Sequence, residues 1–257
     1  MEVKEDILTN IAEGGWIFPQ ETWDNLSGYE KSFINNEFTG IRTLENYKKR
    51  LEFHGFTNMD RVLDAGCGYG QWAHAMAAFN QHIDGVDIDN GRLKGAQEIA
   101  KAMNINNVQF QNSPLETLPF PDNYFDGIFC YSVFMFTDMP KALQQFNRVL
   151  KPSGKLYINT DTIGWYFHLF LDVPRDRLNA LRMLARTLLG YKKNIIVREK
   201  WLKKQLKNAG FEIISLGVEG ETSINSQTNK NDALPFYPQR YYNRKSILEV
   251  IAKKTTR

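Results

Sequence analysis

Short apolar runs alternate with longer amphipathic stretches through the middle of the chain. The apolar runs have the length of buried strands, and the longer stretches repeat apolar residues at helical spacing. Strands joined by helices through short connections form a mainly parallel sheet with helices on both faces, the doubly wound α/β arrangement. The pattern predicts strands at 61–64, 82–87, 108–111, 125–131 and 154–160, and helices at 71–79, 90–103 and 139–150.

The segments on either side of this core have patterns of their own. Apolar residues at helical spacing predict an amphipathic helix over 43–54 that packs on the sheet. Residues 161–196 separate the fifth strand from a helix predicted at 198–209, and we interpret them as an insertion. The insertion opens with an aromatic-rich stretch, and a helical stripe of leucine and alanine side chains follows over 178–188.

The composition is ordinary for a soluble globular protein: 257 residues, 42% hydrophobic and 24% charged. No apolar run approaches the roughly 20 residues that span a bilayer, and the charged N-terminus lacks the apolar core of a signal peptide. Two cysteines make neither a disulfide framework nor a metal cluster. We therefore expect a cytoplasmic protein without a bound metal.

The net charge of +3 is unevenly distributed. Residues 172–200 carry eight basic and three acidic side chains, so this segment more than accounts for the whole excess. The basic residues can form a solvated helix face, or they can guide an anionic substrate or a membrane surface to the protein. The sequence is therefore compatible with peripheral membrane contact, and with either a monomer or a homodimer.

Three glycines at alternate positions follow the first predicted strand. They are Gly66, Gly68 and Gly70, with Asp64 two residues before them, and Asp87 ends the second strand. Glycine lets a ligand approach the backbone closely, and the carboxyl ends of parallel strands meet at one edge of the sheet. We therefore expect a nucleotide-type site there, with the Asp87 carboxylate accepting hydrogen bonds from a ribose diol.

The glycine spacing narrows the kind of nucleotide. A dinucleotide fingerprint needs Gly-x-Gly-x-x-Gly, but Gln71 fills its last position, and no Lys-Ser/Thr pair follows to make a phosphate loop. The carboxylate of Asp64 would also repel a pyrophosphate. The loop therefore favours a cationic or hydrogen-bond-donating ligand.

Four sequence blocks in this order resemble the class I S-adenosylmethionine-dependent methyltransferases, in their type 11 branch. The resemblance covers about residues 58–216 and implies a Rossmann-like sheet of seven strands, with the sixth at 210–214 and an antiparallel last strand at 247–252. The polar stretch 220–232 between them is expected to be a mobile loop. The blocks are Asp-x-Gly-x-Gly-x-Gly at 64–70, Gly-Val-Asp at 85–87, Leu-Pro-Phe-Pro-Asp-Asn-Tyr-Phe-Asp at 118–126 and Arg-Val-Leu-Lys-Pro-Ser-Gly at 148–154.

The resemblance also implies a domain organisation. Residues 1–57 would form an N-terminal helical cap, and residues 58–257 the S-adenosylmethionine-binding domain. The 161–196 insertion would be a helical lid that excludes water and shapes the acceptor pocket. A dimerisation surface is the alternative role for this insertion.

The resemblance assigns site residues by position. Relatives usually carry an acid where this chain has Pro114, so the adenine contact falls to Ser113, Glu116 or the backbone near Leu115. His168 is a candidate general base, and the ring of Tyr131 can attract a cationic sulfonium, which makes these two the candidate catalytic residues. The expected cofactor contacts are Asp64, Ala65, Gly66, Gly68, Asp87, Ile88, Ser113, Leu115 and Tyr131. The expected acceptor contacts are Tyr29, Phe136, Tyr166 and His168, with Arg42 as a further candidate.

The implied activity is transfer of a methyl group from S-adenosylmethionine to an oxygen or nitrogen of a small molecule, leaving S-adenosylhomocysteine. The cationic, aromatic insertion favours an anionic acceptor. Such a displacement mainly requires the acceptor to be held in line with the methyl group. One alternative is a nucleic-acid (RNA) methyltransferase, although the chain has no Asn/Asp-Pro-Pro-Tyr motif and no added RNA-binding module. The other is a cofactor-binding regulator or scaffold without turnover.

Overall fold

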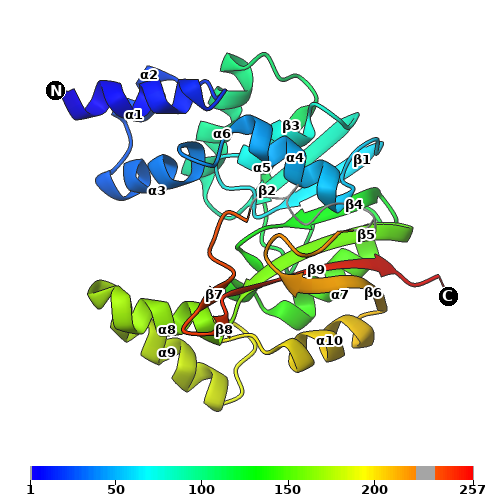
Figure 1. Ribbon diagram of the computed structural model, residues 1–257. Coiled ribbons are helices and arrows are strands. Elements are labelled where there is room, and N and C mark those ends of the chain that lie inside the picture. Colours follow the sequence, from blue (N-terminus) through cyan, green and yellow to red (C-terminus); the bar gives the residue numbers. More distant parts are fainter. Residues whose placement is uncertain (1, 224–234, 257) are drawn as a thin grey trace.

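A seven-stranded sheet forms the centre of the molecule (Figure 1). The computed structural model describes residues 2–223 and 235–256. The strands run in the order β3-β2-β1-β4-β5-β9-β6, and all neighbouring pairs are parallel except those that β9 makes with β5 and β6. This confirms the predicted doubly wound sheet and its antiparallel last strand. The strand bounds are β1 Arg61–Ala65, β2 His82–Asp87, β3 Val108–Asn112, β4 Phe125–Cys130, β5 Leu150–Asp161, β6 Phe211–Val218 and β9 Ile247–Lys254.

Successive residues of the central strands enter two different cores. Val62 and Phe129 lie in the layer on one face of the sheet, whereas their neighbours Leu63 and Ile128 lie in the layer on the other. All four side chains are fully buried. Because side chains alternate along a strand, a strand covered on both faces has to be apolar at consecutive positions. This explains why the sequence shows short continuous apolar runs there.

Helices cover both faces of the sheet. On one face lie α4 Leu44–His54, α5 Gln71–Met76 and α6 Asn90–Ala102, and on the other lie α7 Met139–Val149 and α10 Glu199–Asn208. Three further helices, which we call the cap helices, precede α4: α1 Glu2–Glu13, α2 Gln20–Asp24 and α3 Gly28–Phe38.

Side-chain caps fix where several of these helices begin. Ser27 and Glu30 form a reciprocal capping box at α3, Thr43 accepts from the amide of Asn46 at α4, and Asp89 accepts from two amides at α6. These bonds satisfy amide groups that have no partner within the helix. The sequence therefore encodes these helix starts locally.

The fifth strand is longer than its apolar pattern predicts. It begins at Leu150, four residues early, because α7 leads directly into it. Its pairing with β4 shifts register between the pairs Phe125–Leu150 and Gly127–Lys155. The residues within the shift include Pro152 and Gly154, which interrupt the apolar pattern and hide the start of the strand from a sequence analysis.

The insertion after β5 forms a helical hairpin of α8 Ile163–Asp172 and α9 Arg177–Leu188, joined by the short turn η2 Pro174–Asp176. Figure 1 shows this hairpin and the cap helices on the same side of the molecule, one below the other. A small two-stranded sheet of β7 Arg240–Tyr241 and β8 Arg244–Lys245 contacts α8. Of the loop expected at 220–232, residues 224–232 lie outside the described residues.

Candidate functional site

A cleft of about 430 Å³ lies at the carboxyl ends of the central strands. Gly66 and Gly68 line it from the loop after β1, Asp87 from the end of β2 and Asp161 from the end of β5. Trp165 of α8 and side chains of α3 complete its walls. The cleft therefore brings together three parts of the chain: the strand ends, the cap and the insertion. This is where ligands bind in doubly wound sheets, beside the point at which strand order reverses between β1 and β4.

The glycine loop is fastened to the neighbouring strand. The amides of Gly66 and Cys67 both donate to the carbonyl of Val86, and the amide of Gly68 donates to the Asp87 carboxylate at 2.9 Å. Gly66 has a φ of +84°, and a Cβ built there would lie 2.6 Å from the side chain of Val133. Both the conformation and the close approach require glycine at this position.

Asp87 keeps hydrogen-bonding capacity toward the cleft. One of its oxygens accepts from the amide of Gly68 and the other from the amide of Asp89, each at 2.9 Å. A carboxylate has about four acceptor sites, so two remain for a ligand. The same carboxylate thus holds the loop and can receive a diol.

Asp64 lies behind the loop and does not line the cleft. Its side chain is 1% exposed and accepts from the amide of Ala73 in α5 at 2.9 Å. Burial, with a smaller contribution from Asp87, raises the pKa of this carboxyl to about 8. Asp64 therefore attaches the helix to β1, a role that the glycine motif by itself did not indicate.

Three other expected cofactor contacts also lie outside the cleft lining. Ala65 is buried at the end of β1, and Leu115 is buried in the core between the sheet and α7. The Ser113 amide donates to the carbonyl of Asp87, and its hydroxyl donates to backbone carbonyls of its own loop. By contrast, Ile88 is 74% exposed and lines the cleft.

Tyr131 lines the cleft with its hydroxyl already engaged. The hydroxyl donates to Glu219 at 2.6 Å, and the same Glu219 oxygen accepts from Arg50 at 2.6 Å. Burial raises the pKa of this phenol well above its usual value, so it is neutral at physiological pH. The ring therefore forms a wall of the cleft, while its hydroxyl is held by a buried ion pair.

The structure places the four expected acceptor contacts in three different surroundings. Tyr29 and Phe136 line the cleft, whereas Tyr166 lines a different, apolar pocket between α8 and α9. His168 lines neither, because its ring bonds Asp172 at 2.8 Å and stacks on Tyr241 with a centroid distance of 4.1 Å. A general base has to reach the acceptor, so this geometry gives His168 no support in that role.

Sequence reasoning missed several polar residues of the cleft. Asp161 ends a strand as Asp87 does, so the same rule could have found it. Glu37 gave no signal, because nothing distinguishes it from other acids on an amphipathic helix. In the fold, Glu37 pairs with Arg42 at 2.9 Å and accepts from Gln71 at 3.3 Å. The candidate contact Arg42 is thus buried beside the cleft and also stacks on Tyr237.

Acidic groups dominate the electrostatics of the cleft. Glu37, Asp87 and Asp161 line it, against the single lining cation Arg92 among the described residues. Burial, with a further contribution from Glu219, raises the pKa of Asp161 to about 7. The basic side chains of 172–200 lie elsewhere, since none of that segment lines the cleft. Among the described residues no group of His, Cys, Asp and Glu side chains is arranged to hold a metal ion.

Residues 63–158 match the family model of the methyltransferase domain. An uncharacterized methyltransferase of Bacillus subtilis, YcgJ, is 39% identical over 130 residues, which is 50% of this chain and 48% of that protein. The ubiquinone/menaquinone biosynthesis C-methyltransferase UbiE of Serratia proteamaculans is 35% identical over 113 residues, or 42% of this chain and 45% of that protein. The chain thus matches about half of the length of these relatives.

Solved structures share the fold at lower identity. The crystal structure of YcgJ superimposes with a TM-score of 0.55 and 19% identity, covering 83% of this chain and 98% of that one. The [4+2]-cyclase SpnF superimposes with a TM-score of 0.59 and 18% identity, covering 84% and 82%. The fold therefore also occurs in a protein named for a different reaction, so the chemistry has to be argued from the site.

Proposed function

Residues 63–158 belong to the methyltransferase domain of the class I S-adenosylmethionine-dependent family, and on this premise we propose that the chain transfers a methyl group from S-adenosylmethionine to an oxygen or nitrogen of a small molecule. The observation that carries the proposal is the glycine loop bonded to Asp87, in a cleft whose charged lining residues are three acids and one cation. When bound, the cofactor supplies a methyl group activated by a positively charged sulfur.

The residues of the cleft fit this cofactor. Asp87 has acceptor sites left for the ribose hydroxyls, and Gly66 and Gly68 present backbone without side chains to the cleft. The side-chain oxygen of Gln71 is buried without a hydrogen-bond partner among the described residues. A buried acceptor without a donor is costly, and the ammonium group of the methionine part would be a suitable donor. The Glu37 carboxylate, which pairs with Arg42, lies beside it and is a further acceptor for the same group.

Asp161 is the group we assign to proton removal when the acceptor is a hydroxyl. It lines the cleft, and no side-chain hydrogen bond within the described residues occupies its carboxylate. Its pKa of about 7 suits a base that works near neutral pH. Tyr131 and Phe136 would form walls around the reacting groups, and we assign no proton transfer to Tyr131 because its hydroxyl already donates to Glu219.

The relatives, and not the basic segment, support the small-molecule part of the proposal. UbiE is named for quinone biosynthesis, which favours a small molecule over a nucleic acid, and its name specifies a carbon acceptor. No basic residue of 172–200 lines the cleft, so the charge of that segment does not argue for an anionic acceptor.

The test combines binding with turnover. Calorimetry should show that S-adenosylmethionine and S-adenosylhomocysteine bind, whereas nicotinamide and flavin nucleotides do not. Release of S-adenosylhomocysteine is then measured with panels of small phenols, alcohols, amines, carbon acids and RNA. Turnover confined to RNA or to carbon acids would replace the proposed acceptor. Binding without turnover in any panel would favour a regulator or scaffold, and failure to bind would overturn the cofactor assignment.

A further inference from the structure

The α8–α9 hairpin carries a concentration of exposed apolar side chains. Nine of the sixteen exposed large hydrophobic residues in the described part of the chain lie between residues 163 and 193. In α9 the residues packed inward are Ala180 and Met183, whereas the leucine stripe faces outward. The nine are Phe167, Phe170, Leu171, Leu178, Leu181, Leu184, Leu188, Leu189 and Tyr191. An apolar surface of this kind indicates a binding partner.

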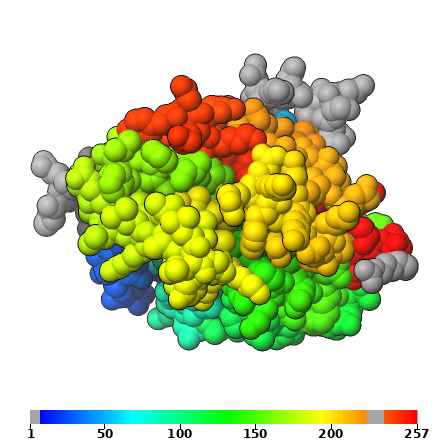
Figure 2. Space-filling model, turned by 90° about the horizontal axis from the view of Figure 1, so that it is seen from below, coloured from blue at the N-terminus to red at the C-terminus, as the bar shows by residue number. Residues whose placement is uncertain are grey.

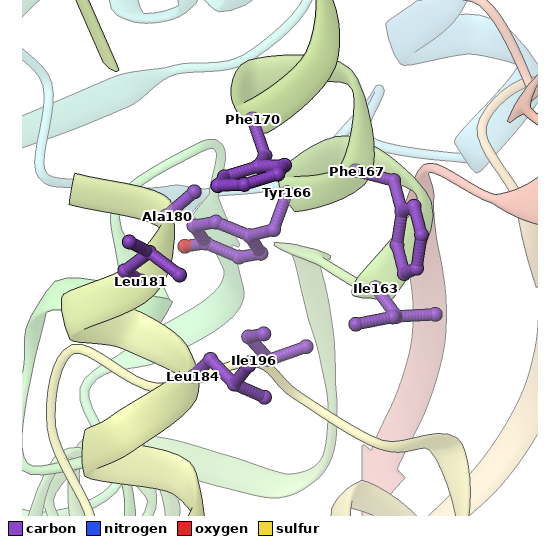
Figure 3. Close-up of a pocket in the computed structure, with 8 residues that line it drawn as sticks. All are labelled: Ile163, Tyr166, Phe167, Phe170, Ala180, Leu181, Leu184 and Ile196. Carbon is purple, nitrogen blue, oxygen red and sulfur yellow. The ribbon is translucent and has the colours of Figure 1, made fainter. Parts of the chain in front are cut away.

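A pocket of about 220 Å³ opens within this surface. Figure 3 shows side chains of α8, among them Phe167 and Phe170, facing Leu181 and Leu184 of α9 across a shared space. None of its eight lining residues is charged. Apolar pockets of this size hold hydrocarbon groups in preference to water.

Positive charge surrounds the apolar surface. Residues 163–193 contain six basic and two acidic side chains, a net +4, which leaves −1 for the rest of the chain. Arg182 is exposed between the pocket residues Leu181 and Leu184, and Lys192 and Lys193 are exposed just beyond α9. Seen from below, the hairpin forms a broad face beside α10 (Figure 2). Segments that lie in a membrane interface typically combine a face of leucine and aromatic side chains with lysines and arginines beside it.

The charge also distinguishes between possible occupants. In a symmetric dimer formed through this face, the same patch would meet itself, so two surfaces of net +4 would be brought together. The surface of an anionic bilayer instead supplies negative headgroups for the cations and acyl chains for the apolar pocket. The charge of the hairpin is therefore complementary to an anionic bilayer and not to a second copy of the same surface.

We propose that the α8–α9 hairpin docks on the surface of an anionic lipid bilayer. Leu178, Leu181 and Leu184 enter the interface, an acyl chain occupies the pocket between the helices, and Arg182, Lys192 and Lys193 contact lipid phosphates. On α8, Trp165 lines the cleft while Phe167 and Phe170 line the pocket, so docking would hold the cleft close to the membrane. No helix among the described residues is long and apolar enough to cross a membrane. The proposal does not depend on the proposed function.

Vesicle flotation tests the proposal. The full chain should float with vesicles of phosphatidylcholine that contain phosphatidylglycerol. Binding should be much weaker with pure phosphatidylcholine, and it should decrease at high salt because the attraction between charges is screened. A wild-type protein that fails to float with the anionic vesicles overturns the proposal.

Matched variants assign the binding to the hairpin. Replacement of Arg182, Lys192 and Lys193 by Gln should weaken binding roughly tenfold or more. The same charge change at Lys94, Lys101 and Lys141 on other elements is the control and should have a smaller effect. The double variant Leu181→Gln with Leu184→Gln tests the apolar contribution and should weaken binding. Its control is Ile41→Gln with Ile214→Gln, because all four residues are exposed. Thermal unfolding checks that each variant is folded.

Equal losses in hairpin and control variants would overturn the proposal. The proposal would also be overturned if the wild type self-associated without floating and the hairpin leucine variants abolished that self-association. The partner of the hairpin would then be a second copy of the chain.

Discussion

At the scale of single residues, Asp87 combines a structural and a ligand-binding position. We predict that Asp87→Ala weakens S-adenosylmethionine binding by about 1.5–3 kcal/mol, the range for hydrogen bonds to a charged group. Calorimetry measures this as a roughly 10- to 150-fold increase in Kd. Asp84→Asn is a matched control, because Asp84 lies on the same strand but faces Arg61 and does not line the cleft. Equal affinities of wild type and Asp87→Ala would remove Asp87 from the site.

Asp161 leads to a prediction about pH. With a hydroxyl acceptor, kcat/KM should rise as pH increases through about 7, because ionised Asp161 can accept a proton. In Asp161→Asn this rise should be lost and the rate at pH 8 reduced by about 10²-fold or more. Asp122→Asn, an acid that precedes the amino end of β4 and pairs with Arg148, should leave the profile unchanged. A wild-type-like profile in Asp161→Asn would exclude the base.

At the scale of elements, one buried ion-pair network joins α4 to the far strands of the sheet. Arg50 of α4 is fully buried and donates to Glu219 at 2.6 Å and to Glu249 at 2.5 Å. Glu249 also accepts from the hydroxyls of Tyr157 and Thr222. The network therefore connects an N-terminal helix with β9 and with the residues after β6, and through Glu219 it also holds Tyr131 at the cleft.

Removing the cation of this network should be costly. We predict that Arg50→Met lowers the free energy of unfolding by about 3–5 kcal/mol, because two buried carboxylates lose their partner. Urea denaturation measures the change, with Lys49→Met on the exposed side of the same helix as control. The double variant Arg50→Met with Glu249→Gln should recover part of the loss. A loss below about 1 kcal/mol in Arg50→Met would show that water or another group compensates the carboxylates.

The hairpin shows the limit of element-scale prediction. The leucine spacing over 178–188 correctly indicated a helix, and α9 covers Arg177–Leu188. The same spacing could not tell which face packs inward, because that depends on what α8 and Ile196 present to it. In the fold the small side chain of Ala180 and the flexible one of Met183 fit against α8, which leaves the larger leucine stripe outside.

At the scale of the whole molecule, buried acids make stability depend on pH. The folded-state pKa values of Asp64 and Asp161 are about 8 and 7, raised mainly by burial from an unfolded value of 3.8. The folded state therefore binds more protons than the unfolded state between these values, and stability falls as pH rises. Burial lowers the pKa values of His54 and His74 from an unfolded value of 6.5 to about 3. Between these values the unfolded state binds more protons, so these two groups make stability rise with pH.

The histidine effect fades above pH 6.5, because the folded-state histidines are neutral there and fewer than half of the unfolded-state ones are protonated. We predict that the free energy of unfolding falls between pH 6.5 and 8, with a slope of up to roughly 1.4 kcal/mol per pH unit for each acid still titrating. Urea denaturation at several pH values measures it. Asp64→Asn with Asp161→Asn should flatten the curve. A wild-type stability that stays constant or rises over this interval contradicts the prediction.

The sequence by itself determined those features that depend on residues close together along the chain. The α/β alternation, the helix caps, the glycine loop and the acid at the end of β2 are all local patterns. Each follows from backbone preferences or burial on a single element, so a short stretch of chain carries the information.

The tertiary structure alone decided which distant residues share an environment. It buried Asp64 behind the loop, brought Glu37 and Trp165 to the cleft, and left His168 beside Tyr241. It also turned the leucine stripe of α9 outward. These outcomes depend on contacts between residues far apart in the chain, where packing and desolvation are set by the partner surface and leave no periodic signal in the sequence.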